Sequence, residues 1–352
     1  MTTRVEPHVA GPAVAEPLVD HAGLQVAARE IESMFAAPFG DGLPMVPVTA
    51  EAHEAMLASM ALDGDASLGT IPPAEATLTA ADVATCAVLA GCRPEYGPVV
   101  AAAARGLTHP AFALYGVACS TKGCAPLVIV NGPVCRRIDL NARDNLFGHG
   151  RRANATIGRA VRLVVQRVGR AEPGVLDRAT LGHPGKHTFC IAEDEEASPW
   201  APLPADRGVA VGTDAVTLVG AEGPRLVDVS DGEPDLLVAG LADAMAVTGG
   251  NTGVGIGDGH RAPPAVVVLA GEHRTLLADA GYGRHDVASA VAERAGSRSA
   301  ARGSIATHDP ADVLVVAAGG HAGRFSCVLR GWSATSRPVT VPLDRSRPLE
   351  IW

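Results

Sequence analysis

The sequence predicts an α/β fold with two similar halves, mostly buried strands and flanking helices. Hydrophobic residues make up 47% of the 352 residues and charged residues 19%, a composition that can bury a sizeable core. Apolar runs followed by a glycine turn recur at 126–133, 265–272 and 313–321, and each is typical of a strand buried on both faces. This recurrence also indicates an internal duplication of a strand, turn and helix unit.

The N-terminal part is expected to be an extension followed by helices. Residues 1–40 are rich in Ala, Pro and acidic residues and show weak periodicity, so no site is expected there. Helices are expected next over 49–62, 79–90 and 95–105. In the second of these, Thr79 and Asp82 form a capping box, and Gly91 marks the end.

The middle of the chain is expected to alternate between strands and a long helix. Strands are predicted over Phe112–Ala118 and Leu127–Val130. A helix capped by Asn154 or Thr156 follows, because apolar residues recur there at helical spacing. These residues are Ile157, Val161, Val164 and Val168.

The second half of the chain is expected to form its own domain. Alternation over Lys186–Ala192 predicts one more strand in the first domain. A Pro- and Ala-rich stretch after Trp200 then marks a boundary near residue 205. The sequence thus predicts α/β domains over 41–205 and 206–352.

Charge and composition exclude several classes of partner. With 29 basic and 38 acidic residues the formal net charge is −9, which disfavours a nonspecific nucleic-acid or anionic-membrane binder. Residues 1–24 lack the pattern of a signal peptide, and no apolar run is long enough to cross a membrane. The 7 cysteines are spread along the chain, which is typical of reduced thiols. We therefore expect a cytoplasmic homo-oligomer whose partner is a small-molecule substrate.

The strongest catalytic candidate is the segment from Cys119 to Cys124. It directly follows the predicted strand Phe112–Ala118, and open α/β sheets place their sites at the carboxyl ends of strands. Lys122, one of two lysines in the chain, would favour a thiolate there. The two thiols can serve as a nucleophile, as a reversible disulfide or as ligands of a soft metal. The alternative is that both are small apolar side chains packed in a tight loop.

A metal site is the second candidate. Cys119, Cys124 and Cys135 could hold an iron–sulfur cluster or a divalent metal, although their spacing matches no compact zinc or ferredoxin pattern. In the thiol hypothesis, by contrast, no cofactor is predicted.

Proton transfer is assigned to His183 and Lys186. Both flank the turn signal Pro184-Gly185, where they can act as acid and base or clamp an anion. The alternative for His183 is a surface or supporting residue. For the carboxylates of 193–196 the pattern favours a solvated loop over a general base or a hard-metal site. His321 follows the third apolar run and is a further candidate for the same cavity.

Substrate binding is assigned to arginine and asparagine side chains. Arg151 and Arg152 open the helix that contains Asn154, so guanidinium groups and helix N–H groups converge on an anion. That anion is either the carboxylate or phosphate of a substrate or a carboxylate of the protein itself. Asn131 and Asn154 complete the set. The glycine-rich run 249–259 follows a predicted helix and precedes a strand, which is the wrong order for a dinucleotide site.

Five phrases of the sequence carry a family resemblance. They are 41–49 (DGLPMVPVT), 91–96 (GCRPEY), 131–133 (NGP), 152–158 (RANATIG) and 182–186 (GHPGK) with the acidic run 192–200. Together they resemble bacterial proteins associated with the UGSC family, named for a motif of selenocysteine or cysteine, Gly, Ser and Cys. The resemblance spans roughly residues 41–330 and implies thiol or selenol chemistry. The chain departs from the name-giving motif, since it carries Cys119-Ser120 with Cys124 further on.

These patterns lead to one functional hypothesis and two alternatives. We expect a small-molecule enzyme in which Cys119 attacks, or is oxidised by, a carboxylate-bearing substrate and Cys124 acts as the resolving thiol. The alternatives are a metal- or iron–sulfur-dependent lyase and a non-catalytic accessory subunit of an oligomer.

Overall fold

The chain divides into two compact units, Met1–Pro47 and Val48–Trp352. The computed structural model describes residues 22–35, 40–246 and 261–343. The first unit contains helix α1 (Ala22–Phe35), so the expected extension includes a helix. The remainder of 1–40, apart from residue 40 itself, lies outside the described residues.

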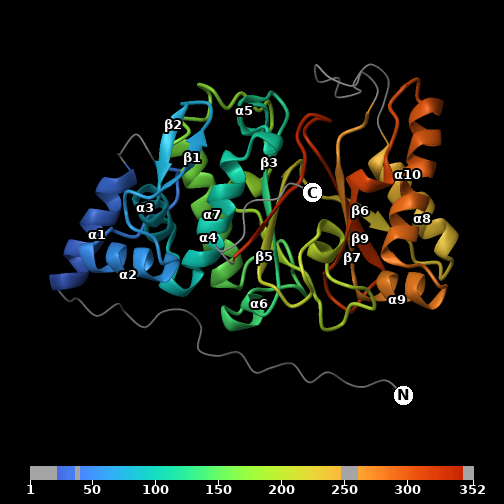
Figure 1. Cartoon of the computed structure of the whole chain (residues 1–352), viewed down its shortest axis with the longest axis horizontal. Coiled ribbons are helices and arrows are strands. Elements are labelled where there is room, and N and C mark those ends of the chain that lie inside the picture. Colours follow the sequence, from blue (N-terminus) through green and yellow to red (C-terminus); the bar gives the residue numbers. More distant parts are fainter. Residues whose placement is uncertain (1–21, 36–39, 247–260, 344–352) are drawn as a thin grey trace. The chain divides into compact units, whose positions relative to one another are not determined.

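The second unit is built around two four-stranded sheets, in the orders β10-β5-β3-β4 and β6-β9-β7-β8 (Figure 1). The strands of the first sheet are β3 (Ala125–Asn131), β4 (Cys190–Ala192), β5 (Ala215–Ala221) and β10 (Val339–Pro342). Those of the second are β6 (Arg225–Asp228), β7 (Ala265–Leu269), β8 (Val313–Ala317) and β9 (Phe325–Arg330). A separate hairpin pairs β1 (Ser67–Ile71) with β2 (Ala76–Thr79).

Helices cover the outer face of each sheet. α4 (Gly97–Thr108) and α7 (Arg152–Arg167) pack on the first sheet, and α8 (Pro234–Met245) and α10 (Arg284–Ala301) pack on the second (Figure 1). The other α-helices of this unit are α2 (Ala50–Met60), α3 (Ala80–Ala90), α5 (Leu114–Cys119), α6 (Val134–Arg137) and α9 (Gly271–Asp279). Short 3₁₀ turns are η1 (Pro94–Tyr96), η2 (Pro110–Phe112), η3 (Pro184–Lys186), η4 (Leu203–Arg207) and η5 (Pro310–Asp312).

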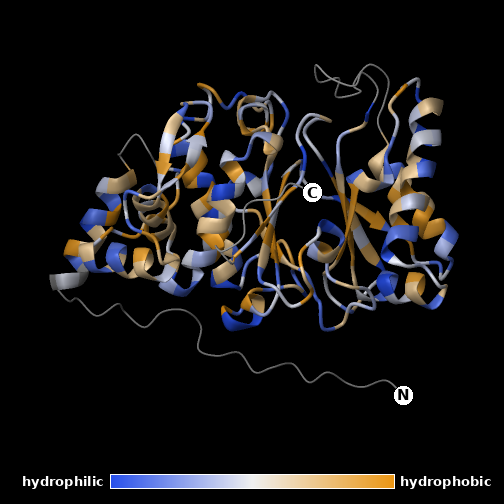
Figure 2. Ribbon diagram, viewed as in Figure 1, coloured by the Kyte–Doolittle hydropathy of each residue, from blue (hydrophilic) through white to orange (hydrophobic). Residues whose placement is uncertain are grey.

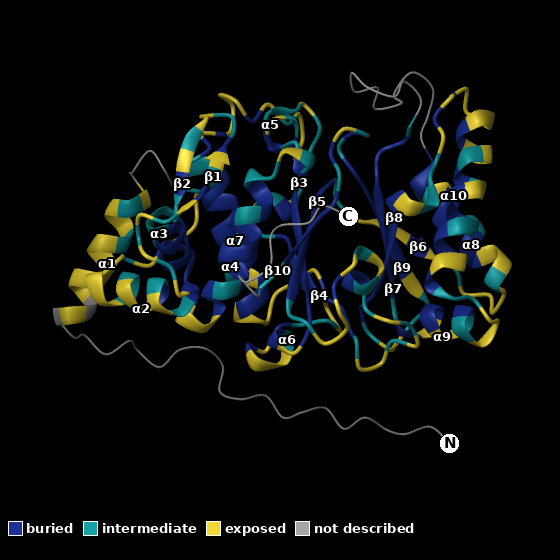
Figure 3. Cartoon of the chain, viewed as in Figure 1, coloured by how far each residue is buried: buried dark blue, intermediate teal, exposed yellow. Residues whose placement is uncertain are grey.

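A hydrophobic core lies between the two sheets. Leu127 and Ile129 of β3 pack against Val266 and Val268 of β7, and all four side chains are at most 3% exposed. β3 and β7 are accordingly hydrophobic in Figure 2 and buried in Figure 3. Strands with both faces covered need continuous apolar runs, which is what the sequence shows at these positions. The predicted α/β fold with mostly buried strands and flanking helices is thus confirmed.

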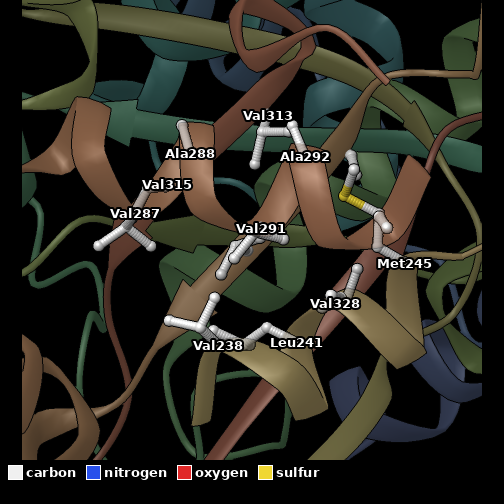
Figure 4. Close-up of a cluster of buried hydrophobic side chains, with 14 of the residues drawn as sticks. Val238, Leu241, Met245, Val287, Ala288, Val291, Ala292, Val313, Val315 and Val328 are labelled. Atoms are coloured by element: carbon white, nitrogen blue, oxygen red, sulfur yellow. The ribbon is translucent and has the colours of Figure 1, made fainter. Parts of the chain in front are cut away.

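A second core joins the second sheet to its helices (Figure 4). Leu241 of α8 and Val291 of α10 lie in it together with Val315 of β8 and Val328 of β9. Each of these side chains is at most 1% exposed. The sheet is therefore buried on this face as well.

Several local predictions are confirmed. Thr79 caps α3, accepting a hydrogen bond from the N–H of Asp82, and the reciprocal bond completes the capping box. The helix ends at Gly91 with φ +88°, a left-handed conformation that favours glycine. In α7 the predicted apolar stripe is buried at Ile157, Val161 and Val164.

Two predicted strands are wrong or too long. The segment Phe112–Ala118 is helical, because it forms the end of η2 and most of α5. Of Lys186–Ala192 only Cys190–Ala192 is a strand, and the residues before it continue from η3. Periodicity cannot separate a short buried helix from a strand, so packing decided both cases.

The cap predicted for α7 is also wrong. The N-cap position is Arg151, and no side chain caps the helix there. Asn154 instead lies inside the helix and bonds the backbone of Asn141 in both directions, accepting from its N–H at 2.8 Å and donating to its carbonyl oxygen at 3.0 Å.

The two sheets share one pattern of connections. In each, the central strand (β3 or β7) has a parallel neighbour (β4 or β8) and an antiparallel one (β5 or β9). Beyond the parallel pairs, Glu193 N–H bonds the Val130 carbonyl and Ala318 N–H bonds the Leu269 carbonyl, both at 3.2 Å. Internal duplication stays a prediction.

The boundary near residue 205 falls within η4. β5 and β10 follow this residue, yet both belong to the first sheet, and β5 pairs with β3 along its whole length. The sheets therefore do not divide at that point.

Candidate functional site

The thiol segment lies at the amino end of β3 rather than at a carboxyl end. Cys119 ends α5, and Cys124 directly precedes β3. Cys124 is 1% exposed, whereas Cys119 is partly exposed. Lys122 Nζ donates to the carbonyl oxygen of Trp332 at 3.0 Å. The expected position of this loop is wrong because the segment before it is a helix.

Neither thiol is activated by its surroundings. Burial, followed by the Asp177 carboxylate, raises the pKa of Cys119. Burial also raises the pKa of Cys124 to about 12, despite the opposing charges of Lys122 and Lys186. A catalytic thiolate needs a lowered pKa.

His183 and Lys186 lie close to the thiol segment, at the same amino end of β3. The N–H of Thr180 bonds the carbonyl oxygen of Thr121 at 3.0 Å and joins the two loops. Lys186 Nζ lies 2.6 and 2.7 Å from the two carboxylate oxygens of Asp177. Burial, with the Lys186 charge second, lowers the pKa of His183. The Lys186 ammonium, for its part, is held in an ion pair with the Asp177 carboxylate.

The three cysteines of the metal hypothesis do not converge. Cys124 and Cys135 flank opposite ends of β3, and a strand of that length spans roughly 20 Å. Within 22–35, 40–246 and 261–343 no group of three His, Cys, Asp or Glu side chains is arranged to hold a metal ion. Cys135 Sγ instead donates to the carbonyl oxygen of Val130 at 3.3 Å.

A pocket of about 370 Å³ lies at the carboxyl ends of β3 and β4. Parallel strands of open α/β sheets place ligand sites at this end. Its charged lining residues are Arg136, Asp139, Arg143, Arg151, Glu193, Asp194, Glu195 and Glu196. The carboxylates of 193–196, for which a solvated loop was the favoured interpretation, therefore line this pocket, and two of them are buried.

Asn131, the last residue of β3, positions two of these carboxylates. Its Nδ2 donates to Glu193 Oε2 at 2.6 Å and to Glu195 Oε1 at 2.9 Å. The N–H of Gly132 donates to the same Glu195 oxygen at 2.7 Å. Gly132 has φ +94°, and a Cβ there would lie 2.7 Å from the Cα of Asp214, so only glycine fits this turn.

A buried ion pair and a backbone hydrogen bond tie this end of the first sheet to the second. Glu193 Oε1 lies 2.6 Å from Arg284 Nη2, and both side chains are at most 8% exposed. Asp194 Oδ1 accepts from Arg143 at 3.1 Å. The backbone N–H of Asp194 donates to the carbonyl oxygen of Ala317 at 2.7 Å. His321 Nε2 lies 3.4 Å from Asp194 Oδ2. The candidate His321 thus contacts a residue that lines the pocket.

The predicted substrate-binding residues have different roles. Arg151 lines the pocket, with Nη1 bonded to Asp139 at 2.8 Å. Asn131 positions the carboxylates of Glu193 and Glu195. Arg152 Nε donates to the carbonyl oxygen of Gly91 at 3.0 Å, and Asn154 supports the backbone after α6, so both hold neighbouring backbone.

Sequence reasoning missed Glu193, Asp194 and Glu195 as site residues. The similarity between the strand segments of the two halves contained a signal for this site. At the ends of the matched strands, Asn131 corresponds to Ala270 and Glu193 to Ala318. Polar residues that replace small ones directly after a buried strand indicate a site at that strand's carboxyl end.

Comparisons with known proteins identify no family for this chain. No family model, no curated protein and no solved structure matches the chain. The resemblance to UGSC-associated proteins therefore stays a prediction.

The glycine-rich run 249–259 lies outside the described residues, and within the described part of the chain no helix is long and apolar enough to span a membrane.

Alkylation of Cys119 by iodoacetamide is expected to be slow at neutral pH and to accelerate as the pH rises. Its raised pKa means that less thiolate is present at a given pH than in an unfolded chain. We expect the rate at pH 8 to be several-fold lower than in urea, measured by mass spectrometry, with Cys119→Ser as the control for site assignment. A rate that levels off below pH 7 would instead restore the thiolate mechanism.

Proposed function

We propose that this protein is a small-molecule enzyme whose substrate binds in the pocket at the carboxyl ends of β3 and β4. The observation that carries the proposal is the meeting of three arginines with the anchored Glu195 carboxylate around one cavity. A pocket with a few convergent polar groups is the usual form of a small-molecule site.

The arginines suit an anionic group of the substrate. In the described chain the Arg151 guanidinium bonds only through Nη1, to an Asp139 side chain that is 77% exposed. A guanidinium has five N–H donors, so most of this one remains available to a carboxylate or phosphate. Arg136, which is 81% exposed and pairs with Glu196, is available in the same way.

Glu195 suits proton transfer. Two N–H donors hold one of its oxygens, which fixes the carboxylate without placing a cation beside it. A positioned carboxylate at the wall of a pocket can accept or return a proton of a bound substrate. This assignment replaces the thiol pair, because burial raises the pKa of both Cys119 and Cys124.

Binding of small anions tests the proposal. Isothermal titration with acetate, malonate and inorganic phosphate is expected to detect binding to the native protein. Arg151→Gln should weaken it at least about tenfold, since a charged hydrogen bond contributes roughly 1.5–3 kcal/mol. Arg294→Gln on α10 is the matched control, because Arg294 pairs with Asp235 of α8 at the surface. This variant should leave anion binding unchanged. Equal affinities in both variants would remove the pocket as the anion site.

A further inference from the structure

We propose that the ligand of this pocket carries a protonated amine as well as an anionic group, so that it is a zwitterion of the amino-acid type. The proposal rests on the proposed function and narrows it to a class of ligand. It starts from the carboxylate of Glu195, which lines the pocket without a neutralising partner.

The other charged groups that line the pocket are already paired. The pairs are Arg136–Glu196 at 2.8 Å, Arg143–Asp194 at 3.1 Å, Arg151–Asp139 at 2.8 Å and Arg284–Glu193 at 2.6 Å. Among the described residues, no Lys, Arg or His lies within ion-pairing distance of Glu195. One negative charge is therefore left for the ligand to neutralise.

The hydrogen bonds of Glu195 leave one oxygen for the ligand. Oε1 accepts from Asn131 Nδ2 at 2.9 Å and from the N–H of Gly132 at 2.7 Å. Oε2 has no hydrogen-bond partner within the described parts of the chain. A protonated amine supplies what this oxygen lacks, namely a positive charge and N–H donors.

Asn131 holds the Glu195 carboxylate in place and lies behind the pocket wall. Its Nδ2 faces the carboxylates of Glu193 and Glu195, and the opposite amide orientation would place an oxygen against both charges. The orientation is therefore fixed. Asn131 is 1% exposed, and its Oδ1 is buried without a hydrogen bond in the region described. The open acceptor at this end of β3 is therefore Glu195 Oε2, which selects a ligand that donates.

The neighbouring thiol does not change this charge balance. Burial, with the Glu195 carboxylate second, raises the pKa of Cys135 to about 12. Cys135 lines the same pocket and stays neutral there. It neither adds a negative charge that would compete for the amine nor supplies a cation for Glu195.

Amino acids and their deaminated counterparts test the proposal on the full-length protein. Thermal shift would screen the common amino acids with β-alanine and 4-aminobutyrate, and titration calorimetry would compare each binder with the matched carboxylate that lacks the amine. At least one amino acid is expected to bind ten times more tightly than its counterpart. Glu195→Gln, which can still accept both N–H bonds at Oε1, should abolish that preference while carboxylate binding remains.

The control is Glu222→Gln, the same change in a glutamate that pairs with Arg225 away from the pocket, and it should keep the preference. If carboxylates bind as well as amino acids, the further inference is wrong and the anion pocket stands. Binding of neither class would remove the proposed function itself. Displacement of a bound amino acid by Ca²⁺ in the native protein but not in Glu195→Gln would assign Glu195 to a metal ion and also overturn the inference.

Discussion

Replacing Arg284 with methionine is expected to lower the free energy of unfolding by about 3–5 kcal/mol. Arg284 Nη2 lies 2.6 Å from Glu193 Oε1 and 2.5 Å from the carbonyl oxygen of Ala201, and Nη1 bonds the carbonyl oxygen of Val315. The glutamate side chain is fully buried, at 0% exposed. Methionine would fill much of the space but would leave this carboxylate without its cation.

A double variant separates charge from packing. Arg284→Met with Glu193→Gln removes both charges, and the new amide can still accept from the remaining partners of position 193, which are the neutral donors Asn131 Nδ2 and the Leu203 N–H. Urea unfolding should show the double variant to be more stable than Arg284→Met alone. Arg294→Met on the same helix is the control, because water screens its exposed pair with Asp235 and the pair contributes little to stability. Equal losses of unfolding free energy for Arg284→Met and Arg294→Met would show that the buried pair stabilises the fold no more than the exposed pair does.

The buried strands β3, β7 and β8 could be predicted from the sequence, but the position of the thiol loop could not. Continuous apolar runs mark β3, β7 and β8 because these strands are covered on both faces. The stretch Phe112–Ala118 is similarly apolar and folds as a helix. That single change of state moved Cys119 and Cys124 from the expected carboxyl end of a strand to the amino end of β3.

The candidate site was visible in part. The turn residue Asn131 and the arginine Arg151 were both assigned to binding, and both lie at the pocket or support it. The acidic residues of 193–196 were expected to be solvated, since a run of carboxylates usually is. Only the fold reveals that buried Arg284 and Asn131 lie against them, and those partners come from residues far apart in the sequence.

The second large effect is expected from Leu241→Ala on α8. Leu241 is fully buried at 0% exposed, between α10 and the helix-facing side of the second sheet, where Val291 and Val328 lie (Figure 4). Shortening it removes buried methyl groups and leaves a cavity that rigid neighbours on two layers cannot fill. The expected loss is about 2–5 kcal/mol in the free energy of unfolding, measured by urea denaturation.

Leu236→Ala provides the comparison within the same helix. Leu236 is 49% exposed, so the same chemical change removes little buried surface and slightly favours the helix. We expect its effect to stay within about 0.5 kcal/mol of the native protein. Because helix propensity and side-chain chemistry cancel between the two variants, their difference measures packing alone. A difference below about 1 kcal/mol would mean that α8 does not seal the outer face of this sheet in solution.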